Sequence, residues 1–209
     1  MLDATARKLI DPPLNAIGAK LAARGVTADG VTLVGLVLGL LAALMIATGC
    51  PLWALIPLLA SRVADGLDGA IARATTKTDF GGYLDISSDF LFYAAIPFAF
   101  VVLDPSANAV AGAFLLTSFY FNGTSFLGYA ILAEKRDMET ASQGVKSLYF
   151  SNGLLEGTET ILFLVLLCLF PNYFSILSWV FGALCFITAT LRIASARHVF
   201  AEESDHQSH

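Results

Sequence analysis

Charged residues are scarce in this chain: Asp, Glu, Lys and Arg make up 14% of its 209 residues, against about 25% in a typical soluble domain. Hydrophobic residues reach 56% and the mean hydropathy is +0.72. This balance excludes an ordinary soluble domain and indicates a membrane protein. The formal net charge of −5 decides little, because in a membrane protein the position of each charge matters more than the sum.

Cysteine and histidine are too few to suggest a zinc or redox site. The three cysteines, Cys50, Cys168 and Cys185, show no CxxC spacing, and we interpret them as small apolar residues of membrane helices. We also expect no cleavable signal peptide. The first long apolar run begins near Val31 and is long enough to span a bilayer rather than to be cleaved.

Six apolar segments approach the roughly 20 residues that a helix needs to cross a bilayer. They cover residues 31–49, 51–73, 84–103, 107–133, 154–170 and 173–196. The connections 74–83 and 134–153 are longer and polar, and the other connections are short turns. The sequence therefore predicts an all-α fold, a six-helix transmembrane bundle.

One membrane domain is expected to cover residues 1–201, with its transmembrane helices in residues 31–196 and a disordered polar tail at residues 202–209. Residues 1–26 form a juxtamembrane amphipathic segment, in which four apolar residues recur at helical spacing: Ile10, Leu14, Ile17 and Leu21. We expect Pro12-Pro13 to start a new helix there rather than to sit inside one. Our interpretation is a helix lying on the cytoplasmic membrane surface; a soluble cap packed on the loops is the alternative.

Basic residues are absent from the short turns. Eleven of the twelve Lys and Arg residues fall in the N-terminal segment, the two long connections, the C-terminal end or the helix ends that border these, and Arg62 alone lies within a span. By the positive-inside rule, both termini and both long connections are cytoplasmic. We therefore expect a multi-pass protein of the cell inner membrane with its active site on the cytoplasmic side.

Four aspartates lie within or beside the second and third apolar segments. Asp65 and Asp68, with Ala72 one turn further, are spaced i, i+3 and i+7 and share one helical face. Asp85 and Asp89, at i and i+4, share a face of the next helix. We expect a short loop containing Gly81 and Gly82 to join the two helices, so that the two acidic faces can meet.

Burying four carboxylates requires a cation. A central Asp costs about 2.5–3.5 kcal/mol, so four cost roughly 10–14 kcal/mol before their mutual repulsion. The single internal arginine, Arg62, cannot offset this cost, whereas Mg²⁺ or Mn²⁺ can, since carboxylates are their natural ligands. No Cys or His is near, which argues against zinc. Gly69 and Ala72, between the acids, leave room for a ligand close to the backbone.

Residues 65–89 read D-G-L-D-G-A-I-A-R, then seven residues, then G-x-x-x-D-x-x-x-D. This pattern resembles the full motif of the CDP-alcohol phosphotransferase (phosphatidyltransferase) family. The resemblance implies metal-dependent transfer of a phosphatidyl group from CDP-diacylglycerol to a hydroxyl acceptor, with release of CMP, in phospholipid biosynthesis. It also implies two Mg²⁺ or Mn²⁺ ions, a homodimer in the lipid bilayer, and no nucleic-acid partner.

The resemblance assigns roles residue by residue. Asp65, Asp68 and Asp85 would be metal ligands, and Asp89 would be both a ligand of the second metal and the general base for the acceptor hydroxyl. The residues expected to border the CDP moiety are Gly69, Ala72, Arg73 and Gly81. The family's Pro-Asn-x-x-Thr element before the first span appears here as residues 28–32, where only the threonine is kept. The resemblance therefore also implies a contact of Thr32 with the CDP moiety.

The acceptor stays open among serine, glycerol phosphate, an inositol phosphate and phosphatidylglycerol. Phe90 stands where phosphatidylglycerophosphate synthases usually have a lysine. The candidate acceptor-pocket residues are Lys135, Arg136, Lys146, Glu156 and Glu159. Glu156 and Glu159 could bind the ammonium of an amino alcohol, the basic residues could bind a phosphorylated polyol, or the glutamates could pair with Lys146 or Arg192.

The competing hypothesis from another functional class is an ion or solute transporter that uses the same aspartates. A transporter needs neither Gly and Ala at fixed places between the acids nor an Arg just after them. A catalytically dead scaffold is disfavoured, because every motif position is intact.

Overall fold

The computed structural model describes residues 2–136 and 157–201, and this part of the chain is helical, without strands. The all-α prediction is therefore confirmed. The helices are α1 (Leu2–Ala22), α2 (Ala28–Ala47), α3 (Pro51–Ala74), α4 (Asp79–Leu103), α5 (Pro105–Lys135), α6 (Gly157–Leu169), the 3₁₀ helix η2 (Pro171–Tyr173) and α7 (Phe174–Ala201).

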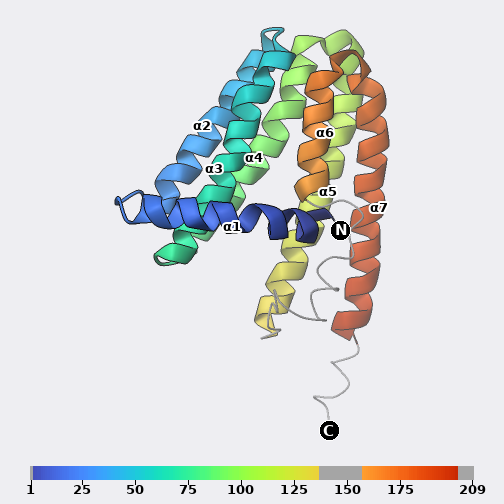
Figure 1. Ribbon diagram of the computed structural model, residues 1–209. Coiled ribbons are helices and arrows are strands. Elements are labelled where there is room, and N and C mark those ends of the chain that lie inside the picture. Colours follow the sequence, from blue (N-terminus) through green and yellow to red (C-terminus); the bar gives the residue numbers. More distant parts are fainter. Residues whose placement is uncertain (1, 137–156, 202–209) are drawn as a thin grey trace.

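Helices α2 to α7 run side by side, and α1 lies across them near one end of the bundle (Figure 1). Helix α2 packs against both α3 and α4, while α5 packs against α7 and is joined to the first group through α4. The α2–α3–α4 group thus forms a compact unit that holds the whole aspartate motif. Helices α5 and α7 continue past α1 in Figure 1.

Within the described residues, four segments are long and apolar enough to cross a membrane: Ala28–Ala47, Asp79–Leu103, Pro105–Lys135 and Pro171–Arg197. They correspond to four of the six predicted spans. Helix α3 is not one of them, because its charged residues interrupt the apolar sequence. Helix α6 has 13 described residues, and the predicted fifth span begins at residue 154, outside the described part. The six-helix transmembrane bundle remains a prediction for these two.

The connection between the two aspartate helices is shorter than predicted. Only residues 75–78 separate α3 from α4, instead of the expected residues 74–83. Gly81 and Gly82 lie in the first turn of α4 and not in a loop, because Thr78 caps the helix: its Oγ1 accepts a hydrogen bond of 3.0 Å from the Gly81 amide. A short, capped connection fixes the two acidic faces relative to each other more firmly than a loop would.

The prediction for the two N-terminal prolines is wrong. Helix α1 is continuous, and Pro12 and Pro13 lie inside it. Both are exposed, so the local distortion that a proline causes displaces no neighbouring helix. On the other side, a Cβ atom at Gly18 would lie 2.7 Å from the Cβ of Ala70, so α1 approaches α3 directly.

The predicted apolar face of α1 divides between two environments. A Cβ at Gly66 of α3 would lie 2.6 Å from Leu14 Cδ1, so Leu14 packs on the aspartate helix. Ile10 and Ile17 are 51% and 47% exposed. Helix α1 therefore rests on the bundle while presenting apolar side chains outward.

The apolar core fills the half of the bundle that lies away from α1. Phe100 of α4 stacks on Phe174 at 5.2 Å between ring centroids, and Phe163 stacks on Phe181 at 3.9 Å. At the α4–α5 turn, Asp104 accepts hydrogen bonds from Ser106 Oγ and the Ala107 amide, which hold the pKa of its carboxyl below the usual range. The aromatic packing and the capped turn hold α4 in place along the bundle axis, and so they fix the position of Asp85 and Asp89.

Candidate active site

Three of the four motif aspartates converge. Asp65 on α3 and Asp85 and Asp89 on α4 each offer a carboxylate oxygen, and these oxygens lie within 4.8 Å of one another. The helical spacing accounts for the arrangement, because Asp85 and Asp89 are one turn apart on the face that α4 turns toward α3. The expectation that the two acidic faces meet is confirmed for these three residues.

Asp68 is held differently. Its side chain is buried, and Thr32 Oγ1 of α2 donates a hydrogen bond of 2.6 Å to its Oδ2 atom. Helix α2 comes this close to α3 because Gly35 has no side chain: a Cβ there would lie 3.2 Å from the Cβ of Ala64. The threonine kept from the family's short element thus contacts an aspartate of the motif.

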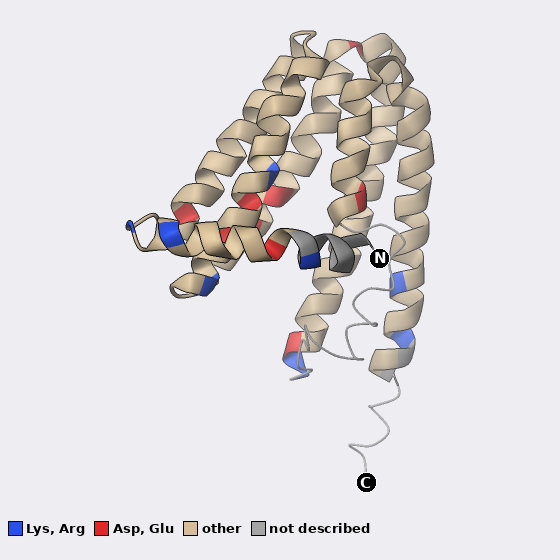
Figure 2. Cartoon of the chain, viewed as in Figure 1, with Lys and Arg blue, Asp and Glu red and all other residues tan. Residues whose placement is uncertain are grey.

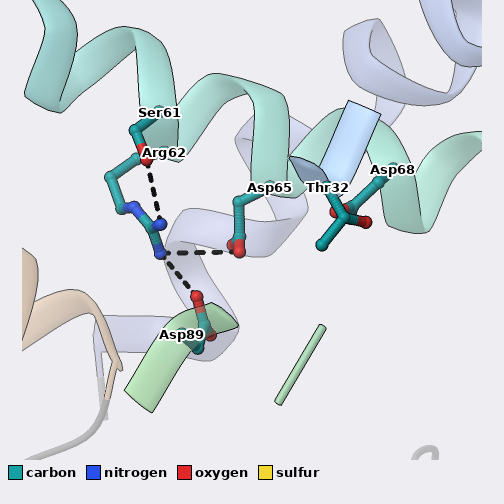
Figure 3. Close-up of polar contacts among 6 residues, drawn as sticks. All are labelled: Thr32, Ser61, Arg62, Asp65, Asp68 and Asp89. Atoms are coloured by element: carbon teal, nitrogen blue, oxygen red, sulfur yellow. Dashed lines mark hydrogen bonds and ion pairs between the residues drawn. The ribbon is translucent and has the colours of Figure 1, made fainter. Parts of the chain in front are cut away.

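Arg62 lies among the carboxylates. Its Nη1 atom donates to Asp89 Oδ1 at 2.8 Å and to Asp65 Oδ1 at 3.4 Å, and its Nη2 atom donates to Ser61 Oγ at 3.1 Å (Figure 3). The guanidinium carbon lies 3.8 Å from the centroid of the Phe92 ring, a cation–π distance. The sequence marked Arg62 only as the arginine within a span.

Apart from Asp85 and Phe92, these side chains border one cavity between α2, α3 and α4. Figure 3 shows Thr32 with Asp68 on one side of Asp65, and Arg62 with Asp89 on the other. The residues that line the cavity are Thr32, Gly35, Leu36, Ser61, Arg62, Asp65, Asp68, Ser88 and Asp89. The cavity is thus acidic, partly buried and bordered by small residues.

Of the residues expected to border the CDP moiety, Thr32 lines this cavity, whereas Gly69, Ala72, Arg73 and Gly81 do not. Arg73 donates from Nε and Nη2 to Asn15 Oδ1 of α1, at 3.2 and 2.9 Å. A Cβ at Gly69 would lie 3.3 Å from Arg73 Nη1, and one at Gly81 would lie 2.9 Å from Thr78 Oγ1. Ala72, on the same helix, is half-buried.

The candidate acceptor residues that the structure describes, Lys135, Arg136 and Glu159, do not line the cavity. Lys135 and Arg136 stand at the end of α5, where Arg136 donates a hydrogen bond of 2.9 Å to the Phe200 carbonyl of α7. Glu159 lies in the first turn of α6. Lys146 and Glu156 lie outside the described residues.

Arg192 is a buried cation that the sequence analysis named only as a possible partner of the glutamates. It lies on α7 and is 8% exposed. Its Nη1 atom donates to the Asn122 carbonyl and side-chain oxygen, at 3.1 and 2.9 Å, and to Ser125 Oγ at 2.7 Å. An arginine inside an apolar helix is a signal that sequence alone provides, but its partners on α5 are visible only in the structure.

Phe90 has a packing role. Its ring lies directly over Gly123 of α5, where the absence of a side chain leaves room for it. The aromatic residue after the fourth aspartate therefore joins α4 to α5.

The comparisons with known proteins find a matching family model and two similar curated proteins. The model of the CDP-alcohol phosphatidyltransferase family matches residues 25–191. "Inner membrane protein YnjF" of Escherichia coli K12 is 48% identical over 195 residues, which are 93% of this chain and 95% of that protein. The archaetidylinositol phosphate synthase of Pyrococcus horikoshii is 40% identical over 93 residues, 44% of this chain and 50% of that protein.

One solved structure has the same fold. The crystal structure of Mycobacterium tuberculosis phosphatidylinositol phosphate synthase (PgsA1) with CDP-DAG bound gives a TM-score of 0.67. The match covers 88% of this chain and 93% of the other at 20% identity, so this likeness concerns the fold alone.

Proposed function

Because this chain belongs to the CDP-alcohol phosphatidyltransferase family, we propose that it transfers the phosphatidyl group of CDP-diacylglycerol to a hydroxyl acceptor and releases CMP. The observation that carries the proposal is the meeting of Asp65, Asp85 and Asp89 inside an otherwise apolar bundle. A cluster of carboxylates in an apolar bundle is costly unless it binds cations. The same cations could bind the negatively charged diphosphate of a nucleotide.

The carboxylates suit a divalent cation that prefers oxygen. Asp65, Asp85 and Asp89 offer oxygens close enough to share one ion or two, with Mg²⁺ or Mn²⁺ as the expected species. Asp68, whose Oδ2 atom accepts a hydrogen bond from Thr32, is the fourth member of the proposed ligand set. When bound, the ions would neutralise the charge that grows on the diphosphate as CMP leaves.

Asp89 is the proposed general base. The acceptor oxygen attacks the phosphorus of the phosphatidyl group, the bond from that phosphorus to the CMP oxygen breaks, and the hydroxyl proton passes to the carboxylate. Asp89 is suited to this because Arg62 occupies its Oδ1 atom and leaves Oδ2 for the proton. Gly69, Ala72, Arg73 and Gly81 would border the CDP moiety around the cavity.

The proposed location is the inner membrane, with several spans and both termini in the cytoplasm. A relative is an inner-membrane protein, and this chain has several helices apolar enough to span. In Figure 2, the Lys and Arg residues of the described part lie toward the end of the bundle with α1, and none lies at the end that holds the α2–α3 and α4–α5 turns. The positive-inside rule then puts α1 and the aspartates on the cytoplasmic side.

A single domain over residues 1–201 and a homodimer complete the proposal. Large side chains remain exposed on α4 and α5, such as Phe98 at 58% and Tyr120 at 75%, and these would face lipid or a second copy. Native mass spectrometry from a mild detergent tests the dimer, and a monomer mass would contradict it.

The acceptor is one of serine, glycerol phosphate, an inositol phosphate and phosphatidylglycerol. Two similar proteins are named as inositol phosphate lipid synthases, which puts inositol phosphate first in an acceptor screen. The basic residues Lys135 and Arg136 at the end of α5 are the proposed contacts for a phosphorylated acceptor, with Lys146, Glu156 and Glu159 from the neighbouring segment.

The test is incubation of the purified protein with CDP-diacylglycerol, Mg²⁺ and each acceptor in turn, following CMP release. We expect release with one acceptor and loss of release in Asp89→Asn. Absence of release with every acceptor, together with aspartate-dependent cation flux in liposomes, would favour the transporter instead.

A further inference from the structure

Arg62 is enclosed by three helices. Ser61 precedes it on α3, and the fully buried ring of Phe92 on α4 has its centroid 3.8 Å from the guanidinium carbon. The Arg62 side chain is only 10% exposed. The aromatic ring and the three hydrogen bonds restrict how far the guanidinium can move.

Gly39 on α2 makes this enclosure possible. A Cβ at Gly39 would lie 2.6 Å from Phe92 Cδ2 and 3.2 Å from Ser61 Oγ. Any side chain there would push against the two residues that hold Arg62. Helices α2, α3 and α4 therefore each contribute to placing one cation.

That cation is the only basic residue among those lining the cavity, in the part of the chain that the structure describes. It binds two of the three converging carboxylates through one nitrogen, Nη1, and reaches only the Oδ1 atom of each. Arg62 does not contact the Oδ2 atom of either carboxylate. Arg62 thus binds one oxygen of each carboxylate and so fixes the direction in which the second oxygen points.

We propose that Arg62 is a fixed counter-ion and positioning residue: it stays on Asp65 and Asp89 when divalent cations bind, and it holds Asp89 in the orientation that accepts the acceptor proton. This inference rests on the proposed function for its catalytic part only. Its positive charge stabilises the metal-free site and weakens cation binding, so removing it has opposite effects on these two properties.

The experiment compares Arg62→Gln and Arg62→Lys with the parent in detergent, without nucleotide. Mn²⁺ binding is measured from the electron paramagnetic resonance signal of free Mn²⁺, and stability from thermal unfolding with and without Mn²⁺. For Arg62→Gln we expect a lower Tm without metal, a larger Tm rise on adding Mn²⁺, and Mn²⁺ affinity at least about tenfold higher. At saturating Mn²⁺, kcat should fall about 10–100-fold while KM for CDP-diacylglycerol changes little.

Arg62→Lys keeps the charge but loses the planar fork that reaches both carboxylates and Ser61. Its Mn²⁺ affinity and metal-free Tm should return toward those of the parent, while kcat stays low. Should Arg62→Gln fail to fold, this variant still separates positioning from charge. Arg24→Gln, at an exposed arginine away from the cavity, is the matched control and should behave as the parent in all three measurements.

Unchanged or weaker Mn²⁺ binding in Arg62→Gln would overturn the counter-ion role. Parent-like kcat at saturating Mn²⁺ in either variant would show that metal displaces Arg62, and would overturn the positioning role. If the parent releases no CMP with any acceptor, the transferase proposal fails on its own, and the Mn²⁺ and Tm comparisons still decide whether Arg62 is the counter-ion.

Discussion

Thr32 and Asp68 are 36 residues apart in the sequence, and the hydroxyl of the first donates a 2.6 Å hydrogen bond to the carboxylate of the second. Both side chains are less than a tenth exposed. Hydrogen bonds to a charged, buried acceptor are among the stronger ones in proteins. The family resemblance gave Thr32 a contact on the nucleotide side, and the structure adds a direct contact with a motif aspartate.

Replacing Thr32 by Val should damage the site without changing its shape. The variant keeps the volume but leaves Asp68 Oδ2 without its donor, so Asp68 can rotate away from the proposed ligand position. We expect kcat/KM for CDP-diacylglycerol to fall about 10–100-fold. Thr32→Ser keeps the hydroxyl and should stay close to the parent. CMP release at several lipid concentrations measures both, and a parent-like Thr32→Val would show that the hydrogen bond has no part in catalysis.

Asp68→Asn and Asp89→Asn should differ in how they change CDP-diacylglycerol affinity and turnover. Loss of a proposed ligand removes charge where the metal must sit, so both CDP-diacylglycerol affinity and turnover should decrease in Asp68→Asn. Asp89→Asn keeps an oxygen but removes the proton acceptor, so turnover should fall by at least ~10²–10⁴-fold with a much smaller loss of affinity. Lipid binding measured beside the CMP-release rate distinguishes them. Turnover of Asp89→Asn near the parent rate would refute the general-base role.

Removal of divalent cations should abolish activity and lower stability together. Asp65, Asp85 and Asp89 repel one another when no ion lies between them, and Arg62 contacts only two of the three. We expect no CMP release in excess EDTA, recovery with Mg²⁺ or Mn²⁺, and a lower Tm in EDTA than in Mg²⁺. Full CMP release in excess EDTA would rule out the two-metal mechanism.

Gly18 should be intolerant of a side chain. A Cβ there meets both the side chain and the backbone of Ala70, which cannot move aside cheaply. Gly18→Val should cost about 1–3 kcal/mol, the usual range for overpacking, and should displace α1 from the aspartate helix. Ala19→Val, at the exposed neighbour, is the control. Thermal unfolding in detergent compares the two, and equal Tm values would mean that α1 does not depend on this contact.

Cysteine labelling tests the orientation with a residue that the chain already carries. Cys50 is exposed at the α2–α3 turn, whereas Cys168 and Cys185 are buried. In intact cells an impermeant maleimide should label Cys50. In a Cys50→Ser background, Thr78→Cys should be labelled only after the membrane is opened, because Thr78 lies at the opposite end of α3 and α4. The reverse pattern would put the aspartates on the periplasmic side.

Much of the fold followed from the sequence because apolar length and helical spacing are local properties. The short turns at Gly49 and Asp104 and the shared face of Asp85 and Asp89 are where the pattern predicted them. The predictions that were wrong concern Pro12, Pro13 and Gly81, whose place in a helix depends on more than the neighbouring sequence. Pro12 and Pro13 are tolerated inside α1 because both side chains are exposed, and Gly81 belongs to α4 because Thr78 supplies a cap.

The sequence by itself determined where the four aspartates stand: their spacing places them on two helical faces whatever surrounds those helices. Only the tertiary structure decided their partners. Thr32 reaches Asp68 because Gly35 lets α2 approach α3, and Arg62 reaches Asp89 because Gly39 leaves space for Phe92 against its guanidinium. These contacts join separate helices, and their distances depend on how the helices pack, which helical periodicity does not specify.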